Sequence, residues 1–140
     1  MKLFQFIIPL TTLFTLALSD LVQYDTVYDN SATSLTTVAC SDGKNGLITK
    51  GYNTFGSLPS FPHVGGASAV EGYNSASCGS CWRLSYANTT IYVTAIDHAG
   101  QGFVIGKTAL QHLGGQQAVD AGKIDAAATR VGGSFCGFNS

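Results

Sequence analysis

Charge is scarce in this sequence, and neither sign dominates. Only 11% of the 140 residues are Asp, Glu, Lys or Arg, with seven basic side chains against eight acidic ones and no block of either sign. Binding to nucleic acid or to an anionic membrane needs a concentrated basic patch, so we expect neither partner. The surface must consist largely of Ser, Thr, Asn, Gln and backbone groups. Such a surface suits neutral partners such as sugars, and it equally suits a soluble coat protein.

Long apolar runs are missing after the first eighteen residues. The stretch from Leu3 to Leu18 is apolar but too short to span a bilayer. It ends in Ala17-Leu18-Ser19, which has small residues at the two positions that signal peptidase recognises. Residues 1–19 are therefore predicted to be a signal peptide. A membrane-anchored N-terminal helix is the alternative, but no second apolar segment follows. We therefore expect a secreted protein without membrane insertion, beginning at Asp20.

Cysteines are few, and only Cys78 and Cys81 lie close together in the chain. Without a second close pair, a zinc site or a redox pair fits poorly, and we expect neither a metal site nor a cofactor. In an exported chain, four cysteines indicate two disulfides, for which three pairings exist. A Cys78–Cys81 bond would close a very tight ring, and we favour Cys40–Cys78 with Cys81–Cys136.

Internal repeats and linkers are also absent, so residues 20–140 are expected to form one domain of about 120 residues. Seventeen glycines and three prolines punctuate the chain, most densely between residues 41 and 72. The elements expected in the first half are a strand at 22–28, a short helix at 34–39 capped by Thr33 or Ser34, and a short extended piece at 47–50.

The second half of the chain has clearer patterns. Residues 81–86 and 90–97 are predicted to pair as a hairpin with its tip at 87–89, and the nearly apolar stretch 91–96 indicates a central strand buried on both faces. The remaining expected elements are a strand at 103–105, brief helices at 108–113 (capped by Thr108) and 116–121, and a strand at 124–131. Six short strands, two small helices and tight glycine turns favour a mainly β barrel over a two-layer sandwich.

Five stretches of the chain match one family in their order and spacing. The match as a whole extends over nearly all of residues 20–140 and includes all four cysteines, so it is specific. The stretches are Tyr24–Asn30, Ala39–Leu47, Phe61–Gly66, Gly72–Trp82 and Ala95–Gly100. In these motifs the chain resembles the cerato-platanins, which are small secreted fungal proteins.

The resemblance implies a fold, a disulfide pattern and a set of partners. The implied fold is a six-stranded double-ψ β-barrel with two or three short helices, similar to barwin and to the first domain of expansins. The implied disulfides are again Cys40–Cys78 and Cys81–Cys136. The resemblance further implies an extracellular or fungal cell-wall location, binding of chitin-type N-acetylglucosamine oligomers, self-association at surfaces, and recognition as an elicitor by a plant or host immune receptor.

Two positions depart from the family pattern. Where the family usually has Gly-Trp before the cysteine pair, this chain has Tyr73, and where the family usually has Gly-Phe-Asn, it has Val104 in place of the amide. The missing amide removes both a donor and an acceptor near the implied sugar site. Affinity or preferred ligand is therefore expected to differ from that of relatives.

Asp97 is the first candidate for the binding site. It ends an otherwise apolar strand, where a carboxylate is either paired internally or presented at the mouth of a groove. The resemblance places it in the groove, where it would accept hydrogen bonds from sugar hydroxyls or from an acetamide N–H. The alternative is that Asp97 accepts backbone N–H groups of Ala99 and Gly100 and only shapes that turn.

Four neighbours complete the candidate carbohydrate site. His98 can donate to a ligand, although a lone surface histidine beside a turn is often without function, and Gly100 lies in the adjoining turn. Tyr73 and Asn74 together offer a stacking ring and an amide, a sensible pairing for a sugar. The alternative is that these two residues pack against the region 78–81.

Two further residues are singled out by their context. Trp82 directly follows a cysteine in a predicted strand, which favours a place in the core over a sugar platform. Asn88 begins an Asn-Thr-Thr sequon at the predicted hairpin tip, an exposed place where a glycan can attach.

An enzyme is the main alternative function, because double-ψ barrels also host glycoside hydrolases. Such an enzyme needs two carboxyl groups, about 6.5–9.5 Å apart for inversion and closer for retention. The acids available in principle are Glu71, Asp120 and Asp125, and nothing in the sequence places one of them opposite Asp97. We therefore expect a non-catalytic protein. A surface-active coat protein whose sugar binding is incidental is the third interpretation.

Overall fold

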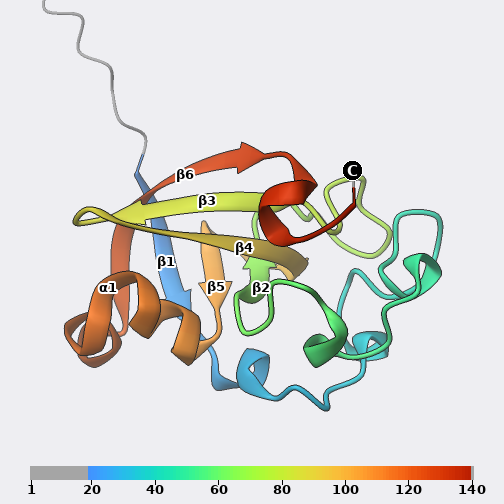
Figure 1. Ribbon diagram of the computed structural model, residues 1–140, viewed down its shortest axis with the longest axis horizontal. Coiled ribbons are helices and arrows are strands. Elements are labelled where there is room, and N and C mark those ends of the chain that lie inside the picture. The colour runs from blue at the N-terminus through green and yellow to red at the C-terminus, as the bar shows by residue number, and fades with distance from the viewer. Residues whose placement is uncertain (1–18, 140) are drawn as a thin grey trace, which may run out of the picture.

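The computed structural model describes residues 19–139, in which six strands close into a barrel (Figure 1). The strands are β1 (Ser19–Tyr24), β2 (Val64–Ala67), β3 (Cys81–Tyr86), β4 (Thr89–His98), β5 (Phe103–Ile105) and β6 (Lys123–Val131). Their order around the barrel is β1-β5-β2-β4-β3-β6. The predicted mainly β, six-stranded barrel is confirmed. The predicted signal peptide, residues 1–19, lies outside the described residues except for Ser19.

Two of the six strand pairings are parallel, those of β1 with β5 and of β2 with β4. Parallel neighbours cannot be joined by a tight turn, so the chain must cross over between them, as in a double-ψ barrel. The antiparallel pair β3–β4 forms the predicted hairpin. Its turn residues Ala87 and Asn88 have φ values of 46° and 68°, which suit the twist of a two-residue hairpin turn.

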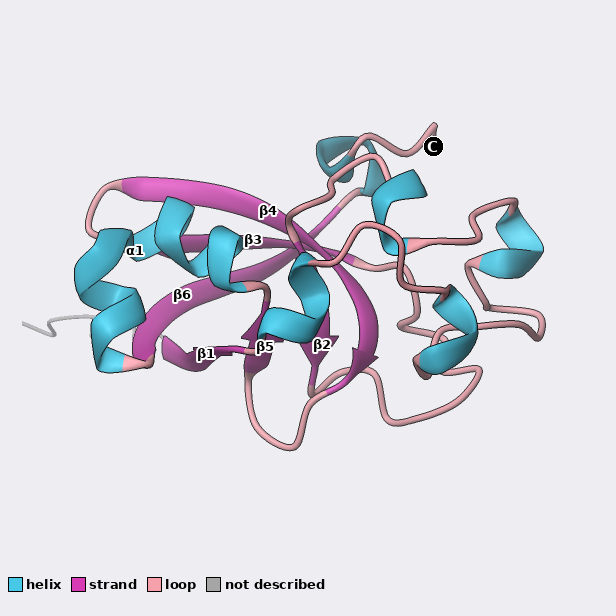
Figure 2. Cartoon of the chain, turned by 90° about the horizontal axis from the view of Figure 1, so that it is seen from below, coloured by secondary structure: helices cyan, strands magenta, loops and turns pink. Residues whose placement is uncertain are grey.

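The core contains buried apolar side chains from the barrel strands, from one helix packed against the barrel, and from the loops beside it. The stretch from Val93 to Ile96 in β4 is buried throughout, which confirms the predicted central strand. The helix α1 (Lys107–Ala121) packs against β4, β1 and β6, and Figure 2 shows it along one side of the barrel. Its buried residues are Ala109, Leu110, Leu113, Ala118 and Val119. Within residues 19–139, no helix is long and apolar enough to cross a lipid bilayer.

Helix α1 corresponds to the two predicted brief helices, which join at a kink where Gly115 has a φ of 72°. The predicted cap Thr108 is wrong, because the N-cap position is Gly106 and has no side chain. Instead, the carboxylate of Asp29 accepts the N–H groups of Lys107 and Thr108, at 2.9 and 3.0 Å. A cap that comes from 78 residues away in the chain is invisible to local sequence rules.

The strand predicted at 22–28 is wrong beyond Tyr24. Residues Thr26–Asp29 form a 3₁₀ helix, η1, because the Asp25 side chain accepts the Val27 N–H at 2.9 Å and so caps a turn. The extended piece predicted at 47–50 is also wrong, because Ile48–Lys50 form another 3₁₀ helix, η3. It ends at Gly51, whose φ of 101° suits glycine and closes the turn.

The other short elements are closer to the predictions. The helix predicted at 34–39 is present as η2 (Leu35–Thr37), with the Ser34 side chain accepting the Thr36 N–H. Two more 3₁₀ helices are η4 (Phe55–Ser57) and η5 (Gly133–Cys136). In Figure 1, the loops that carry η2, η3 and η4 lie beside the barrel, on the side away from α1.

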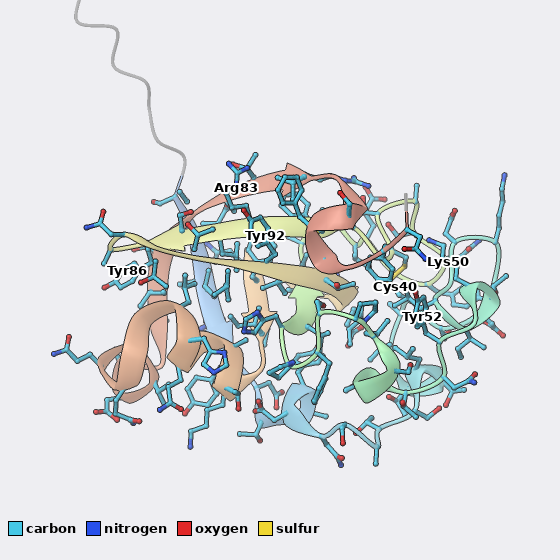
Figure 3. The ribbon with its side chains drawn as sticks, viewed as in Figure 1. Cys40, Lys50, Tyr52, Arg83, Tyr86 and Tyr92 are labelled. Atoms are coloured by element: carbon cyan, nitrogen blue, oxygen red, sulfur yellow. A yellow bond between two sulfur atoms is a disulfide. The ribbon has the colours of Figure 1, made fainter. Side chains whose placement is uncertain are left out.

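Both predicted disulfides are present. Cys40 pairs with Cys78 and Cys81 pairs with Cys136. Cys40 lies in the loop-rich half of the molecule, apart from Arg83 and Tyr92 on the barrel (Figure 3). The first disulfide therefore joins two loops, whereas the second joins the start of β3 to η5.

Candidate functional site

Asp97, near the end of β4, binds groups from three parts of the chain. Its Oδ1 accepts the backbone N–H groups of Ala39 and His98, at 3.1 and 2.9 Å, and its Oδ2 accepts the Tyr28 hydroxyl at 3.0 Å. The Ala99 N–H donates to the Ala67 carbonyl and not to Asp97, unlike the turn considered from the sequence. Asp97 is half-buried, so it both ties the loop at residue 39 to the barrel and stays accessible.

Tyr28 is a site residue that the sequence reasoning missed. It lies in η1, is 6% exposed and stacks on Phe55. Burial, followed by the charge of Asp97 and the hydrogen bond to it, raises the pKa of Tyr28 well above its usual value. The hydroxyl therefore stays protonated and donates to Asp97 across the physiological pH range. The sequence feature that could have identified Tyr28 is its position in the family motif at residues 24–30.

His98 and Gly100 lie on the exposed side of Asp97. The His98 ring donates its Nδ1–H to the Val70 carbonyl at 2.7 Å, which leaves Nε2 for another partner. Gly100 is exposed, and a Cβ at this position would meet no atom within 4 Å. The surface beside Asp97 is therefore open.

Tyr73 and Asn74 form hydrogen bonds with a different loop from the one in the alternative considered from the sequence. The Tyr73 ring is 64% exposed, and its hydroxyl donates to Asp42 Oδ1 at 2.7 Å. This hydrogen bond is the largest of the effects that raise the pKa of Tyr73. Asn74 Oδ1 accepts the Asn45 N–H at 2.9 Å, and its carbonyl accepts the Asn45 side chain at 3.0 Å. These contacts are with the loop at 42–45, not with the region 78–81.

The two groups of candidate residues are linked through one segment. Ala39 donates to Asp97, and Asp42, three residues later, accepts from Tyr73. Among the described residues, no side-chain hydrogen bond joins Asp97 or His98 directly to Tyr73 or Asn74. We call the five predicted residues together the Asp97 surface: Asp97, His98, Gly100, Tyr73 and Asn74.

Comparison with known proteins assigns the chain to a family. The family model named cerato-platanin matches residues 21–138. The chain belongs to the cerato-platanin family. The heat-stable 19 kDa antigen of Coccidioides immitis is 45% identical over 130 residues, which are 93% of this chain and 89% of that protein. The allergen Asp f 15 of Aspergillus fumigatus is 47% identical over 115 residues, or 82% and 75% of the two chains.

Solved structures agree with this assignment. The crystal structure of cerato-platanin 3 from M. perniciosa has a TM-score of 0.83 and 47% identity, covering 86% of this chain and all of that one. The solution structure of the fungal elicitor cerato-platanin has a TM-score of 0.74 and 34% identity, covering 83% and 95% of the two chains. The fold of this cerato-platanin is therefore the family's fold.

Trp82 and Asn88 lie outside the Asp97 surface of this cerato-platanin. The Trp82 ring is half-buried, donates to Ser80 Oγ at 2.8 Å and packs edge-on against Phe103, so it contributes to the core. Asn88 is exposed at the β3–β4 turn, as predicted. A glycan on Asn88 stays a prediction.

In the described part of the chain, no hydrogen bond joins Asp97 to the acids considered as catalytic partners. Asp120 accepts from Gln116 within α1, and Asp125 lies on β6 in register with Leu21 of β1. Glu71 makes no hydrogen bond to Asp97 in the described part of the chain. Residues 19–139 also contain no group of three His, Cys, Asp or Glu residues that could hold a metal ion.

Three hollows in the described part of the molecule, of about 320, 270 and 470 Å³, have none of the five residues of the Asp97 surface in their linings.

Proposed function

We propose that this cerato-platanin is a secreted, non-catalytic protein of the fungal cell wall that binds chitin-type N-acetylglucosamine oligomers at the Asp97 surface. The proposal rests on the different numbers of hydrogen bonds that the two Asp97 oxygens accept. Each carboxylate oxygen can accept two hydrogen bonds. Oδ1 already accepts two backbone N–H groups, whereas Oδ2 accepts only the Tyr28 hydroxyl. Oδ2 therefore keeps one acceptor position for a sugar hydroxyl or an acetamide N–H.

Tyr73 also supports the proposal. Its exposed ring offers a face to a pyranose, and the hydrogen bond to Asp42 limits the positions that the ring can adopt. A neutral ligand is favoured by the low charge of the whole chain. Contacts with a neutral polymer need no basic patch.

Absence of catalysis and a role in immune recognition are parts of the same proposal. The inference that catalysis is absent rests on membership of the cerato-platanin family and on the sequence, which places no second acid opposite Asp97. We infer an elicitor role from the relatives, one of which is described as a fungal elicitor and others as an antigen and an allergen. Self-association at surfaces and an expansin-like loosening of wall polymers belong to this proposal on the family resemblance.

Titration with chitin oligomers, followed by backbone amide shifts, tests the binding site. We expect Asp97→Ala to weaken binding by about 1.5–3 kcal/mol, which is roughly tenfold to a hundredfold, while the melting temperature falls by a few degrees. Asp125→Ala, which removes an exposed carboxylate on β6, is the matched control and should bind as the wild type does.

Four other results would overturn parts of the proposal. Unchanged affinity in a folded Asp97→Ala variant would move the site to Tyr73 and Asn74. A loss of stability with residual binding that tracks the folded fraction would make Asp97 a structural residue only. New reducing ends on chitin or cellulose would indicate a hydrolase, and no retention on insoluble chitin would favour a coat protein.

A further inference from the structure

The other two histidines of the chain, His63 and His112, contact each other at the opposite end of β2 from His98. His63 directly precedes β2, and His112 lies in the first half of α1. Their Nε2 and Nδ1 atoms are 2.8 Å apart, and the ring centroids are 5.1 Å apart at an interplanar angle of 76°. His98 is separate from this pair, because it lies next to Ala67 at the far end of β2.

The backbone of His63 is held in place by hydrogen bonds on both sides. Its N–H donates to the Ser60 carbonyl at 2.8 Å, and its carbonyl accepts the Ser60 hydroxyl at 2.8 Å and the Thr94 N–H at 3.1 Å. The His63 side chain is half-buried. His112, by contrast, is exposed and can turn.

We propose that His63 and His112 form a binding site for a divalent copper ion. Imidazole nitrogens are ligands of choice for divalent copper, nickel and zinc. In the free pair, one proton lies between the two nitrogens. When the metal binds, His112 carries that proton on Nε2 instead, by exchange with water, so that both facing nitrogens present lone pairs.

The separation of the two nitrogens lets one ion reach both. In the free pair, the 2.8 Å separation is that of a hydrogen bond, with the proton between the nitrogens. Two metal bonds of about 2.0–2.1 Å place the nitrogens roughly 2.9–3.3 Å apart. Turning of the exposed His112 ring brings its lone pair toward the same point as that of His63. Copper also binds most tightly in the usual order of first-row divalent ions.

The protein supplies two ligands, because no third His, Cys, Asp or Glu joins the pair in the part of the chain that the structure describes. Water completes the coordination. A bound ion would connect the segment before β2 to α1 and would raise the melting temperature through its preference for the folded state.

Copper titration of the folded mature protein tests the site. We expect about one equivalent of Cu²⁺ by calorimetry, two-nitrogen coupling in the paramagnetic resonance spectrum, and a higher melting temperature with excess Cu²⁺. His112→Gln and His63→Gln should each weaken binding by at least about tenfold and abolish the two-nitrogen pattern. His112 is exposed, so its variant should fold normally.

His98→Gln is the matched control, because it removes the third and last histidine of the chain and should retain the copper signal. Equal copper binding by the wild type and His112→Gln, or no binding by the wild type, would reduce the pair to a hydrogen bond between the loop and α1. Tighter binding of Zn²⁺ than of Cu²⁺ would overturn the assignment to copper.

Discussion

Tyr28 and Asp97 show how a single hydrogen bond can orient a binding group. The buried hydroxyl lies 69 residues from the carboxylate in the chain and donates to the same oxygen that has an acceptor position left. Because the pKa of Tyr28 is raised, the hydroxyl remains a donor at every physiological pH. Under the proposed function, Tyr28 is a positioning residue, which acts on the ligand through Asp97.

Tyr28→Phe is expected to weaken both stability and binding. The substitution keeps the ring and its packing on Phe55 but removes the donor to a half-buried carboxylate, which should lower the free energy of unfolding by about 1–2 kcal/mol. Urea unfolding measures this loss, and titration with chitin oligomers at low denaturant measures the loss of affinity. Tyr86→Phe, on β3 beside α1, is the control (Figure 3). Wild-type values for both quantities in Tyr28→Phe would contradict the positioning role.

At the scale of elements, local patterns predicted the structure well where the determinants are themselves local. The β3–β4 hairpin, the two segments of α1 and β6 follow from alternation, apolar spacing and glycine positions. The segment at 26–29 was misassigned because one side-chain hydrogen bond from Asp25 turns an alternating stretch into a helix. Alternation alone does not distinguish these two outcomes.

Strand β2 could not be predicted for a different reason. Two of its four residues, Gly65 and Gly66, have no side chain to show alternation. They are glycines because neighbouring strands lie very close: a Cβ on Gly65 would overlap Val104 O, and a Cβ on Gly66 would lie 2.8 Å from His98 O. The requirement comes from the closed barrel, not from the local sequence.

The Asp29 cap of α1 allows a direct test at this scale. Asp29→Ala leaves the Lys107 and Thr108 N–H groups without their acceptor and also removes a negative charge from the positive end of the helix, so we expect a loss of about 1–2 kcal/mol. Urea unfolding measures the size of this loss. Hydrogen exchange at the Lys107 and Thr108 amides shows whether the loss is located at the start of α1. Asp29→Asn should recover part of the loss.

Asp25→Ala is the comparison for the cap, because Asp25 lies in the same segment but its side chain accepts the Val27 N–H and no N–H group of α1. It should leave exchange at the start of α1 unchanged. Equal exchange at Lys107 and Thr108 in the wild type and in Asp29→Ala would show that the carboxylate does not cap the helix.

At the scale of the whole molecule, the candidate site could be predicted only in part. Asp97 was visible because it ends an apolar strand and belongs to a family motif. Its partners Tyr28 and Ala39 were not, because they lie 69 and 58 residues away and meet it only in the folded chain. Likewise, Asp42 and Asn45 hold Tyr73 and Asn74 across about thirty residues of sequence.

The two disulfides stabilise different parts of this arrangement. Cys40–Cys78 joins the loop that contains Ala39 and Asp42 to the loop that contains Tyr73 and Asn74, so it links both parts of the Asp97 surface. Cys81–Cys136 joins β3 to η5, and neither half-cystine is next to a residue of that surface. The first disulfide therefore serves the site, whereas the second serves the C-terminal end of the barrel.

Paired serine variants should separate these two roles. The bonds span 38 and 55 residues, so in the chain-entropy model each contributes a similar stabilisation of about 4 kcal/mol. Similar losses in melting temperature are therefore expected for Cys40→Ser with Cys78→Ser and for Cys81→Ser with Cys136→Ser. Only the first pair should lose affinity for chitin oligomers beyond its unfolded fraction, when both are titrated at a temperature where they are folded. An equal loss of affinity in both pairs would mean that the Asp97 surface depends on overall stability and not on the disulfide that joins its loops.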